Sequence, residues 1–405
     1  MLVHCTSIES PVLYVLILLP MREIIFIYLI LISFSCTNGK ADKANQENTF
    51  KSKSLSLAEN YSLPLDAETP LWNYYSQHAE IDGKPKLIWF NPNRYSIDYF
   101  DIQSQTLERK VKIDQNGPNA IPGMGLNSSI KFINEDTVVL YSGPLRQIFL
   151  SDISGEAYKK IDLSDYPSGF GSIALNTSIA YRKGSVYMQV LPIMPIEIPE
   201  NFNPKYNKIA KIDLSDGSVK EFEIDYPEVY SDKNISQQLK MMSIIYNDKI
   251  DKFVISYPLS DDLYVTDFES GVKRYPASSE LVGEVIPIDR RNSEIEPARI
   301  QNSYYWMNDC YEGLIFDEEN ELYLRTVRKG ITLEQLNNRN FVTDTQILIF
   351  NKDFEQVEQI NERGPTFDYS FFFDKKFYWN KDIQKYNLEA GNEDEIFFQS
   401  RDLPF

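Results

Sequence analysis

Short apolar segments alternate with turn residues along most of this chain, and six of them end in the same way. In each, an apolar strand runs into Asp or Asn and then a short turn, at Phe100-Asp101, Ser151-Asp152, Ile212-Asp213, Thr266-Asp267, Phe350-Asn351 and Tyr386-Asn387. In four copies a glycine follows within three or four residues: Gly155, Gly217, Gly271 and Gly391. Asp and Asn side chains bond the backbone of a turn, and glycine adopts the positive φ that such turns need. The pattern predicts six outer hairpins of one repeated unit.

The first unit shows the pattern most clearly. Its predicted strands are residues 72–81, 86–90, 96–102 and 107–113, joined by turns at Asp82–Pro85 and Asn91–Arg94. Further inner strands are predicted near residues 129–134, 178–182, 239–247, 311–316 and 366–373. Spacing of this kind is typical of units of about 40 to 50 residues with insertions of variable length. We therefore predict an all-β fold, a six-bladed β-propeller of four-stranded antiparallel blades, with a pair of β-sandwiches as the competing fold.

The ring must close, because an open end leaves strand edges unpaired. Two arrangements are possible from the sequence. Either residues 55–63 add an edge strand to the sixth blade, or the segment from Pro365 to Phe405 supplies all four of its strands.

The N-terminus has a different composition from the repeats. Met21-Arg22 precedes an apolar run, residues 24–34, that stops at Ser35-Cys36. A basic start, a short apolar core and a small residue before the cut are typical of a secretory signal, whereas a spanning helix needs about 20 apolar residues. We predict that residues 1–36 are a signal sequence that ends in the lipidation cysteine Cys36, with Met21 as the working start. A plain secretory signal and a two-segment membrane hairpin are the alternatives.

A polar segment separates this signal from the repeats. Residues 37–54 are rich in Asn, Lys, Ser and Gln, which predicts a flexible tether, and residues 55–405 then form the propeller. The formal net charge of the chain is −18, which argues against nucleic acid and anionic headgroups as partners. If Cys36 carries lipid, Cys310 has no intramolecular disulfide partner, and we predict that it is a buried core residue.

The connections between strands divide into two sets on opposite faces of the predicted ring. On one face all are short turns; on the other are the long segments 115–128, 192–208, 225–236, 276–309 and 329–344. Long loops on a rigid scaffold commonly carry function. The segment 332–341 predicts a short helix capped by Thr332, acting as a lid or a packing element.

Two of these long segments contain the candidate ligand-binding residues. In 276–309 they are Arg290, Arg291, Arg299, Tyr304, Tyr305 and Trp306; in the proline-rich 192–208 they are Phe202 and Tyr206. Arginine offers forked donors to carboxylate or sulfate, and Tyr or Trp offers a flat surface to sugar rings or to a protein. The alternative is that these aromatic side chains pack onto the ring while the charges remain solvated.

Catalytic signatures are sparse. His78 is the one histidine after the signal, it falls within a strand pattern, and we predict a structural role for it. No G-x-S-x-G, H-E-x-x-H, calcium-loop or Walker pattern occurs. We assign no catalytic residue and expect no cofactor. Paired carboxylates leave a carbohydrate-active or lactone-hydrolysing enzyme, and a hard-metal site in the central channel, as open alternatives.

The signal ending at Cys36, the polar tether, and outer turns such as Asp267-Phe268-Glu269-Ser270-Gly271 resemble those of a Bacteroidota family of outer-membrane lipoproteins of unknown function. That resemblance implies a TolB-like six-bladed propeller in the cell envelope, facing either the periplasm or the cell surface. We predict a binding module that is attached to the membrane through a lipid anchor and presents its long-loop face to a protein, peptide or glycan.

Overall fold

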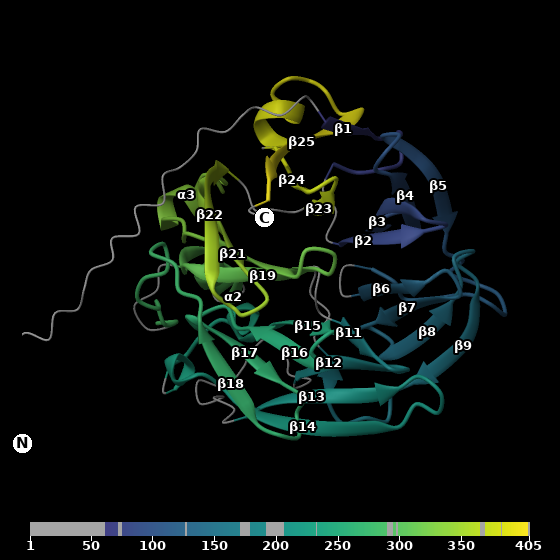
Figure 1. Cartoon of the computed structure of the whole chain (residues 1–405), viewed down its shortest axis with the longest axis horizontal. Helices are drawn as coiled ribbons and strands as arrows, with labels where there is room; N and C mark the ends of the chain where they lie inside the picture. Colours follow the sequence, from purple (N-terminus) through teal and green to yellow (C-terminus); the bar gives the residue numbers. More distant parts are fainter. Residues whose placement is uncertain are drawn as a thin grey trace, which may run out of the picture. The chain divides into compact units, whose positions relative to one another are not determined.

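The computed structural model describes residues 61–71, 75–125, 128–170, 179–191, 206–231, 233–289, 295–296, 299–364, 369–381 and 383–403. These residues form six antiparallel sheets arranged around a common centre (Figure 1). The fold is a six-bladed β-propeller, which confirms the prediction and makes the paired β-sandwiches wrong. None of the described helices is long and apolar enough to cross a membrane.

Each blade runs from an innermost strand to an outermost one. In blade one the strands are β2 (Ser76–Ile81), β3 (Lys84–Asn91), β4 (Ser96–Asp101) and β5 (Thr106–Lys112). In blade two they are β6 (Ser128–Asn134), β7 (Thr137–Ser142), β8 (Gln147–Ser151) and β9 (Ala157–Asp162). In blade three they are β11 (Ile179–Arg182), β12 (Ser185–Leu191), β13 (Tyr206–Asp213) and β14 (Val219–Asp225), with the short β10 (Gly169–Phe170) also paired to β12.

The remaining blades follow the same plan. In blade four the strands are β15 (Ser243–Asn247), β16 (Lys252–Ser256), β17 (Asp262–Thr266) and β18 (Val272–Pro276). In blade five they are β19 (Cys310–Asp317), β20 (Leu322–Arg328), β21 (Thr343–Phe350) and β22 (Gln356–Gly364). In blade six they are β23 (Ser370–Phe373), β24 (Lys376–Asn380), β25 (Glu395–Asp402) and β1 (Tyr61–Pro64).

The apolar core lies between the blades. Along β3, Leu87 and Trp89 pack with residues of blade six, whereas Ile88 and Phe90 pack with residues of blade two. Successive side chains of a strand point to opposite faces, so a middle strand between two neighbouring blades can be apolar at consecutive positions, as in Leu87 to Phe90. This geometry explains the continuous apolar runs of the sequence.

The first and last of the described strands, β1 and β25, close the ring. β1 pairs antiparallel with β25, with Tyr61 opposite Phe398, and the Leu63 side chain is fully buried there. The Tyr61 hydroxyl donates to the carbonyl oxygen of Ile102 at 2.7 Å, which links this strand to blade one. The prediction that the segment 55–63 adds an edge strand to blade six is therefore confirmed, with the described strand at Tyr61–Pro64. The alternative, in which all four strands follow Pro365, is wrong.

Five of the six predicted outer turns are confirmed. In the turn after β17, Asp267 Oδ1 accepts hydrogen bonds from the backbone N–H groups of Glu269 and Ser270 at 2.8 and 2.7 Å. The sixth prediction, at Tyr386-Asn387, is wrong, because these residues lie in the short helix η4 (Gln384–Leu388) between β24 and β25. β1 supplies the outer strand of this blade, so no outer turn is needed.

Two strand boundaries also differ from the prediction. The first turn has only two residues, Asp82 and Gly83 with φ of 51° and 68°, and Pro85 already lies in β3. Two consecutive residues with positive φ form the tight hairpin whose twist matches its strands. The inner strand of blade four begins at Ser243, because Leu239 lies in the 3-10 helix η2 (Gln237–Lys240).

Candidate functional site

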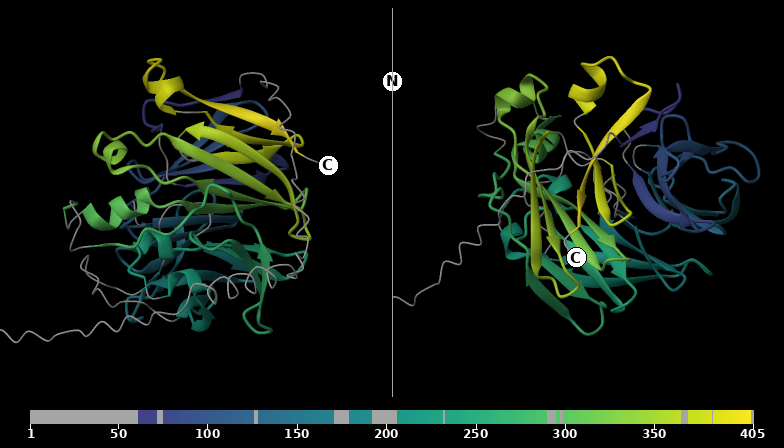
Figure 2. Two further views of the ribbon diagram at one scale, coloured as in Figure 1. Left: turned by 90° about the vertical axis from the view of Figure 1, so that its left-hand side faces the viewer. Right: turned by 45° about the horizontal axis from the view of Figure 1, so that its top comes forward.

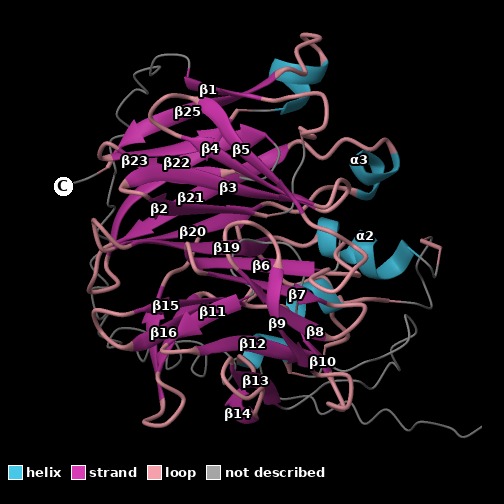
Figure 3. Cartoon of the chain, turned by 90° about the vertical axis from the view of Figure 1, so that its right-hand side faces the viewer, coloured by secondary structure: helices cyan, strands magenta, loops and turns pink. Residues whose placement is uncertain are grey.

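The two faces of the propeller differ in what their connections contain. On the turn face, described connections between strands are two to five residues long. The opposite face, here called the loop face, carries α2 (Ile300–Met307), α3 (Leu333–Asn337), η1 (Glu228–Tyr230), η2 and η4. Figure 3 shows α2 and α3 on one side of the ring, and the left view of Figure 2 shows these two helices, in green, on one side as well. The division of short and long connections matches the sequence prediction.

Exposed apolar side chains follow the same division. Among the described residues, eight large apolar side chains are exposed, and five of them lie in loop-face connections: Tyr95, Leu145, Ile286, Phe341 and Tyr386. Most of the exposed apolar side chains therefore lie on the loop face, in connections of several different blades.

The predicted residues of the longest segment lie on or beside α2. Arg299 precedes the helix and is exposed to solvent. Tyr304 is buried at 7% exposure beside Ile288 and Ile300, and its hydroxyl accepts a hydrogen bond from the Asp289 N–H at 3.3 Å. The two predicted residues therefore lie in different surroundings. The Arg299 side chain is in solvent, and the Tyr304 side chain packs beneath α2.

Tyr305 and Trp306 lie at the end of α2, above the buried guanidinium of Arg328. Arg328 Nη2 donates to the Tyr305 carbonyl at 3.1 Å, and Nη1 donates to the Trp306 carbonyl at 3.0 Å. The guanidinium also lies 4.8 Å from the Trp306 ring centroid. The last carbonyls of a helix lack partners within the helix, and a basic side chain placed there satisfies them.

A buried carboxylate neutralises this arginine. Glu312 Oε1 accepts from Arg328 Nε at 2.6 Å, and the side-chain exposures of Glu312 and Arg328 are only 4% and 1%. Cys310 is buried beside them, as predicted, and burial raises the pKa of its thiol to about 12. These groups hold the C-terminal end of α2 on blade five.

The predicted short helix is confirmed as α3. The Thr332 hydroxyl accepts from the Gln335 N–H at 3.1 Å, and the Gln335 side chain accepts from the Thr332 N–H at 3.0 Å, which is a capping box. Beyond the helix, Phe341 packs against Trp306 with ring centroids 4.9 Å apart. Trp306 and Phe341 therefore form one partly exposed aromatic pair on the loop face.

The other candidate residues are not brought into this group. Arg290, Arg291 and Phe202 lie outside the described residues. Tyr206 is the first residue of β13, opposite Asp225, so it lies in a strand and not in the predicted loop. The tight pairing of β13 with β14 extends the strand further than the sequence indicated.

Sequence reasoning missed a second buried arginine, Arg325 of β20. Its guanidinium lies 3.4 Å from the centroid of the Tyr311 ring and donates to the carbonyl oxygens of Ala277 and Tyr257 at 2.8 and 3.2 Å. Burial lowers its pKa to about 10, so it remains charged at neutral pH. It fixes two loop-face connections of blade four. The only sequence signal is the placement of arginine within an apolar strand.

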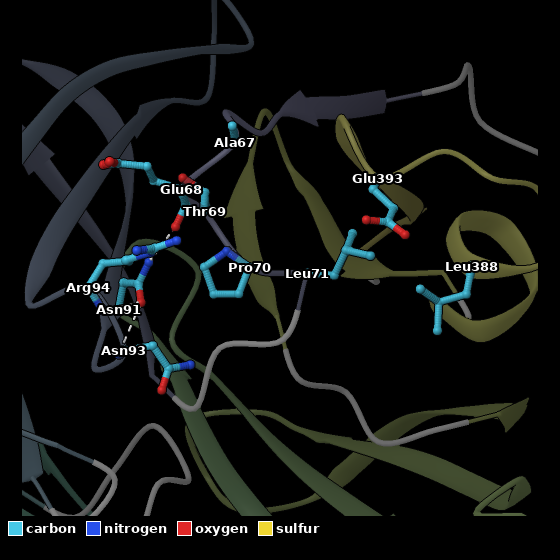
Figure 4. A pocket seen from close by; sticks show the side chains of 10 residues that line it. All are labelled: Ala67, Glu68, Thr69, Pro70, Leu71, Asn91, Asn93, Arg94, Leu388 and Glu393. Atoms are coloured by element: carbon cyan, nitrogen blue, oxygen red, sulfur yellow. Dashed lines mark hydrogen bonds between the residues drawn. The ribbon is translucent and has the colours of Figure 1, made fainter.

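Sequence reasoning also missed a pocket of about 500 Å³ on the loop face between blades one and six. Its lining comes from the segment after β1, the turn between β3 and β4, and the connection between β24 and β25. The lining residues are Ala67, Glu68, Thr69, Pro70, Leu71, Asn91, Asn93, Arg94, Leu388 and Glu393 (Figure 4).

A buried polar network supports the blade-one side of this pocket. The Thr69 hydroxyl lies 2.8 Å from Asp66 Oδ1 and 3.2 Å from the fully buried Asp98 Oδ2. Lys110 Nζ lies 2.7 Å from Asp66 and 4.0 Å from Asp98. Burial raises the pKa of Asp98, while hydrogen bonds from Ser96 and Thr69 and the charge of Lys110 favour its ionised form. The network fixes the segment that forms the pocket wall.

The two alternatives left open by the sequence, an enzyme that uses paired carboxylates and a metal site in the channel, are not supported by any described cluster of side chains. His78 lies on β2, the innermost strand of its blade, and its side chain is exposed. Within the described ranges, no three His, Cys, Asp or Glu side chains are placed to hold a metal ion together. The carboxylate enzyme and the channel metal site stay predictions.

The chain is a β-propeller that carries its described helices, a pocket and most of its exposed apolar side chains on one face. In proteins with such a rigid scaffold, binding residues commonly lie on the loops. Residues 47–360 match the family described as a domain of unknown function, DUF4221, and the chain belongs to that family. No curated protein sequence matches the chain significantly.

Two solved structures are similar to this chain over most of its length. One is a DUF4221 family member from Bacteroides vulgatus, with 18% identity and a TM-score of 0.67, covering 86% of this chain and 98% of that one. The other is a Bacteroides fragilis protein proposed to be exported, with 13% identity and a TM-score of 0.51, covering 87% and 98%. At these identities the similarity shows the fold alone. The predicted resemblance to a Bacteroidota propeller family of unknown function is confirmed.

Proposed function

We propose that this protein is a lipid-anchored binding module of the cell envelope that presents its loop face to a protein, peptide or glycan ligand. The observation that carries the proposal is the asymmetry of the two faces. Two- to five-residue turns cover one face, while the other has α2, α3, the pocket and five exposed apolar side chains. Rigid strands that support a varied loop surface are the arrangement of many recognition domains.

Anchoring depends on Cys36. The short apolar run before this cysteine and the polar segment after it support export and lipidation, and the similar Bacteroides fragilis protein is itself proposed to be exported. The outer-membrane location and the TolB-like character stay predictions.

Replacing Cys36→Ser is expected to abolish incorporation of an alkyne-labelled fatty acid and to move the protein from the membrane fraction to the soluble fraction, because a lipid chain contributes membrane affinity through each buried methylene. Cys310→Ser is the matched control, since that thiol is buried in blade five. Equal labelling of the Cys36 variant and the parent chain would show that lipid is not attached at this cysteine.

Ligand contact through the loop face is tested by site-specific photo-cross-linking in intact cells. A benzophenone amino acid at Phe341 or Tyr386 is expected to give discrete adducts, because these exposed side chains lie on the loop face. The same group at Tyr158, which is 57% exposed on the outer strand β9, is the control and is expected to give none. Adducts at Tyr158 alone would place the binding surface elsewhere and sink the proposal.

A further inference from the structure

The pocket between blades one and six is lined by three charged side chains: Arg94, Glu68 and Glu393. Figure 4 shows the Glu68 carboxylate turned away from Glu393, which leaves Arg94 and Glu393 on opposite sides of the pocket. Arg94 comes from the turn between β3 and β4 on one side, and Glu393 comes from the connection between β24 and β25 on the other (Figure 4). Both side chains are exposed, and neither makes an ion pair or side-chain hydrogen bond with any residue in the described part of the chain. A ligand that complements both walls must itself carry a positive and a negative group.

The backbone around Arg94 is fixed while its guanidinium remains available. The Asn91 side chain is buried, and its Oδ1 accepts hydrogen bonds from the N–H groups of Asn93 and Arg94 at 3.2 and 3.1 Å. Asn91 Nδ2 donates to the Glu68 carbonyl at 3.0 Å, which joins this turn to the segment after β1. Pre-organised walls reduce the entropy that a ligand loses on binding.

Three apolar side chains also line the pocket, beside the polar Thr69, Asn91 and Asn93. Pro70 and Leu71 come from the segment after β1, and Leu388 comes from η4 (Figure 4). The Leu71 carbonyl accepts a hydrogen bond from the buried Tyr369 hydroxyl at 2.8 Å, so this part of the surface is fixed to blade six. An apolar group flanked by opposite charges therefore matches the pocket.

Peptide chemistry satisfies these conditions better than saccharide chemistry. A neutral sugar would cover the Arg94 guanidinium and the Glu393 carboxylate without supplying either counter-charge, and burying an unpaired charge is costly. A short peptide carries an ammonium and a carboxylate at its two ends and a side chain between them. Two or three extended residues span roughly 7–10 Å, and ligand pockets commonly hold roughly 300–1,000 Å³.

We propose that this pocket binds a di- or tripeptide in its zwitterionic form. The peptide carboxylate pairs with Arg94, the ammonium group pairs with Glu393, and an apolar side chain rests on Pro70, Leu71 and Leu388. The inference rests on the proposed function of the loop face and specifies one ligand class for it. A bound peptide would also bridge blades one and six, the two blades that close the ring.

Isothermal titration calorimetry of the full-length protein with the tripeptide Ala-Leu-Ala tests the inference. Acetylation of its N-terminus or amidation of its C-terminus is expected to weaken binding roughly 10- to 100-fold, the usual effect of losing one charged hydrogen bond. The Arg94→Gln variant is expected to bind the free acid and the amide equally, and Glu393→Gln is expected to bind the free and acetylated amines equally. Arg109→Gln and Glu389→Gln change exposed residues outside the lining and are the matched controls.

Three results would overturn the inference: no heat with Ala-Leu-Ala, equal binding of the blocked and free peptides, or preferential binding of glucose or N-acetylglucosamine. Circular dichroism confirms that each variant is folded, so loss of binding is not mistaken for loss of structure. Cross-links from Phe341 or Tyr386 combined with absent peptide binding would disprove the peptide pocket and leave the proposed function of the loop face intact.

Discussion

A chain shortened to begin at Ala67 is expected to lose its cooperative unfolding transition, whereas a chain that begins at Asn60 is expected to melt like the full-length protein. The difference between the two is β1, which buries Tyr61 and Leu63 in the apolar cluster between blades six and one, and Leu65 next to it. Full burial of one such side chain contributes roughly 1.5–3 kcal/mol, and a typical domain has a net stability of only about 5–15 kcal/mol. Removing this strand also leaves β25 as an open edge.

Thermal unfolding followed by circular dichroism, together with size-exclusion chromatography, distinguishes the two truncated chains. We expect the chain that begins at Ala67 to aggregate or to elute as an expanded species. If both truncated chains gave the same melting temperature, closure of the ring by β1 would contribute nothing to the fold.

Replacing Arg328→Ala is expected to lower the free energy of unfolding by roughly 3–5 kcal/mol, the usual cost of removing one partner of a buried ion pair. The substitution leaves the Glu312 carboxylate buried without a counter-charge. It also removes the donors that Arg328 supplies to the carbonyl oxygens of Tyr305 and Trp306 at the end of α2. Urea denaturation measures the loss.

Two further variants identify the cause of that loss. The double variant with Arg328→Met and Glu312→Leu is expected to regain part of the stability, because it removes both buried charges at similar volume. Lys352→Ala breaks an ion pair with Asp353 in which both side chains are more than half exposed, and is expected to leave the free energy of unfolding almost unchanged. A single Arg328→Ala variant as stable as Lys352→Ala would show that the buried pair is not a structural anchor.

The repeat could be predicted from the sequence because its signal is local. An Asp such as Asp267 needs only the backbone of the next few residues to form its turn, so the pattern stands in the sequence however distant segments are arranged. The same holds for α3, whose capping box lies entirely within Thr332 to Gln335. Local hydrogen bonding therefore gave both the blades and the one helix that was predicted.

Asn387 shows where a local signal fails. It follows Tyr386 and precedes Gly391, a spacing shared with true outer turns, but its side chain donates to the carbonyl oxygens of Asn392 and Glu395. These residues belong to the connection between β24 and β25 and to the start of β25. The role of Asn387 depends on the pairing of β1 with β25, and the residues near it in the sequence give no sign of that pairing.

The pocket and the buried arginines could not be predicted for the same reason: both depend on contacts between segments that are far apart in the sequence. Glu393 and Arg94 approach the same space only because the ring closes between blades six and one, and neither lies in a distinctive motif. Arg325 and Arg328 would be assigned to the surface by composition, and only the carbonyl oxygens and the carboxylate around them explain their burial. Tyr304 conversely belongs to the packing of α2, which an aromatic residue in a long segment does not reveal.

The pairing of Tyr61 with Phe398 sets the order in which this protein can fold. Blades one, two, four and five are each built from consecutive strands that can form hairpins as soon as they are synthesised. Blade six must wait, because its outer strand β1 is the first of the described strands along the chain and its partner β25 is the last. Joining ends separated by roughly 340 residues costs about 5 kcal/mol of chain entropy, and such distant pairing is slow. Until β25 is synthesised, β1 lacks its partner strand, so the propeller can be completed only after the last of its described strands is made.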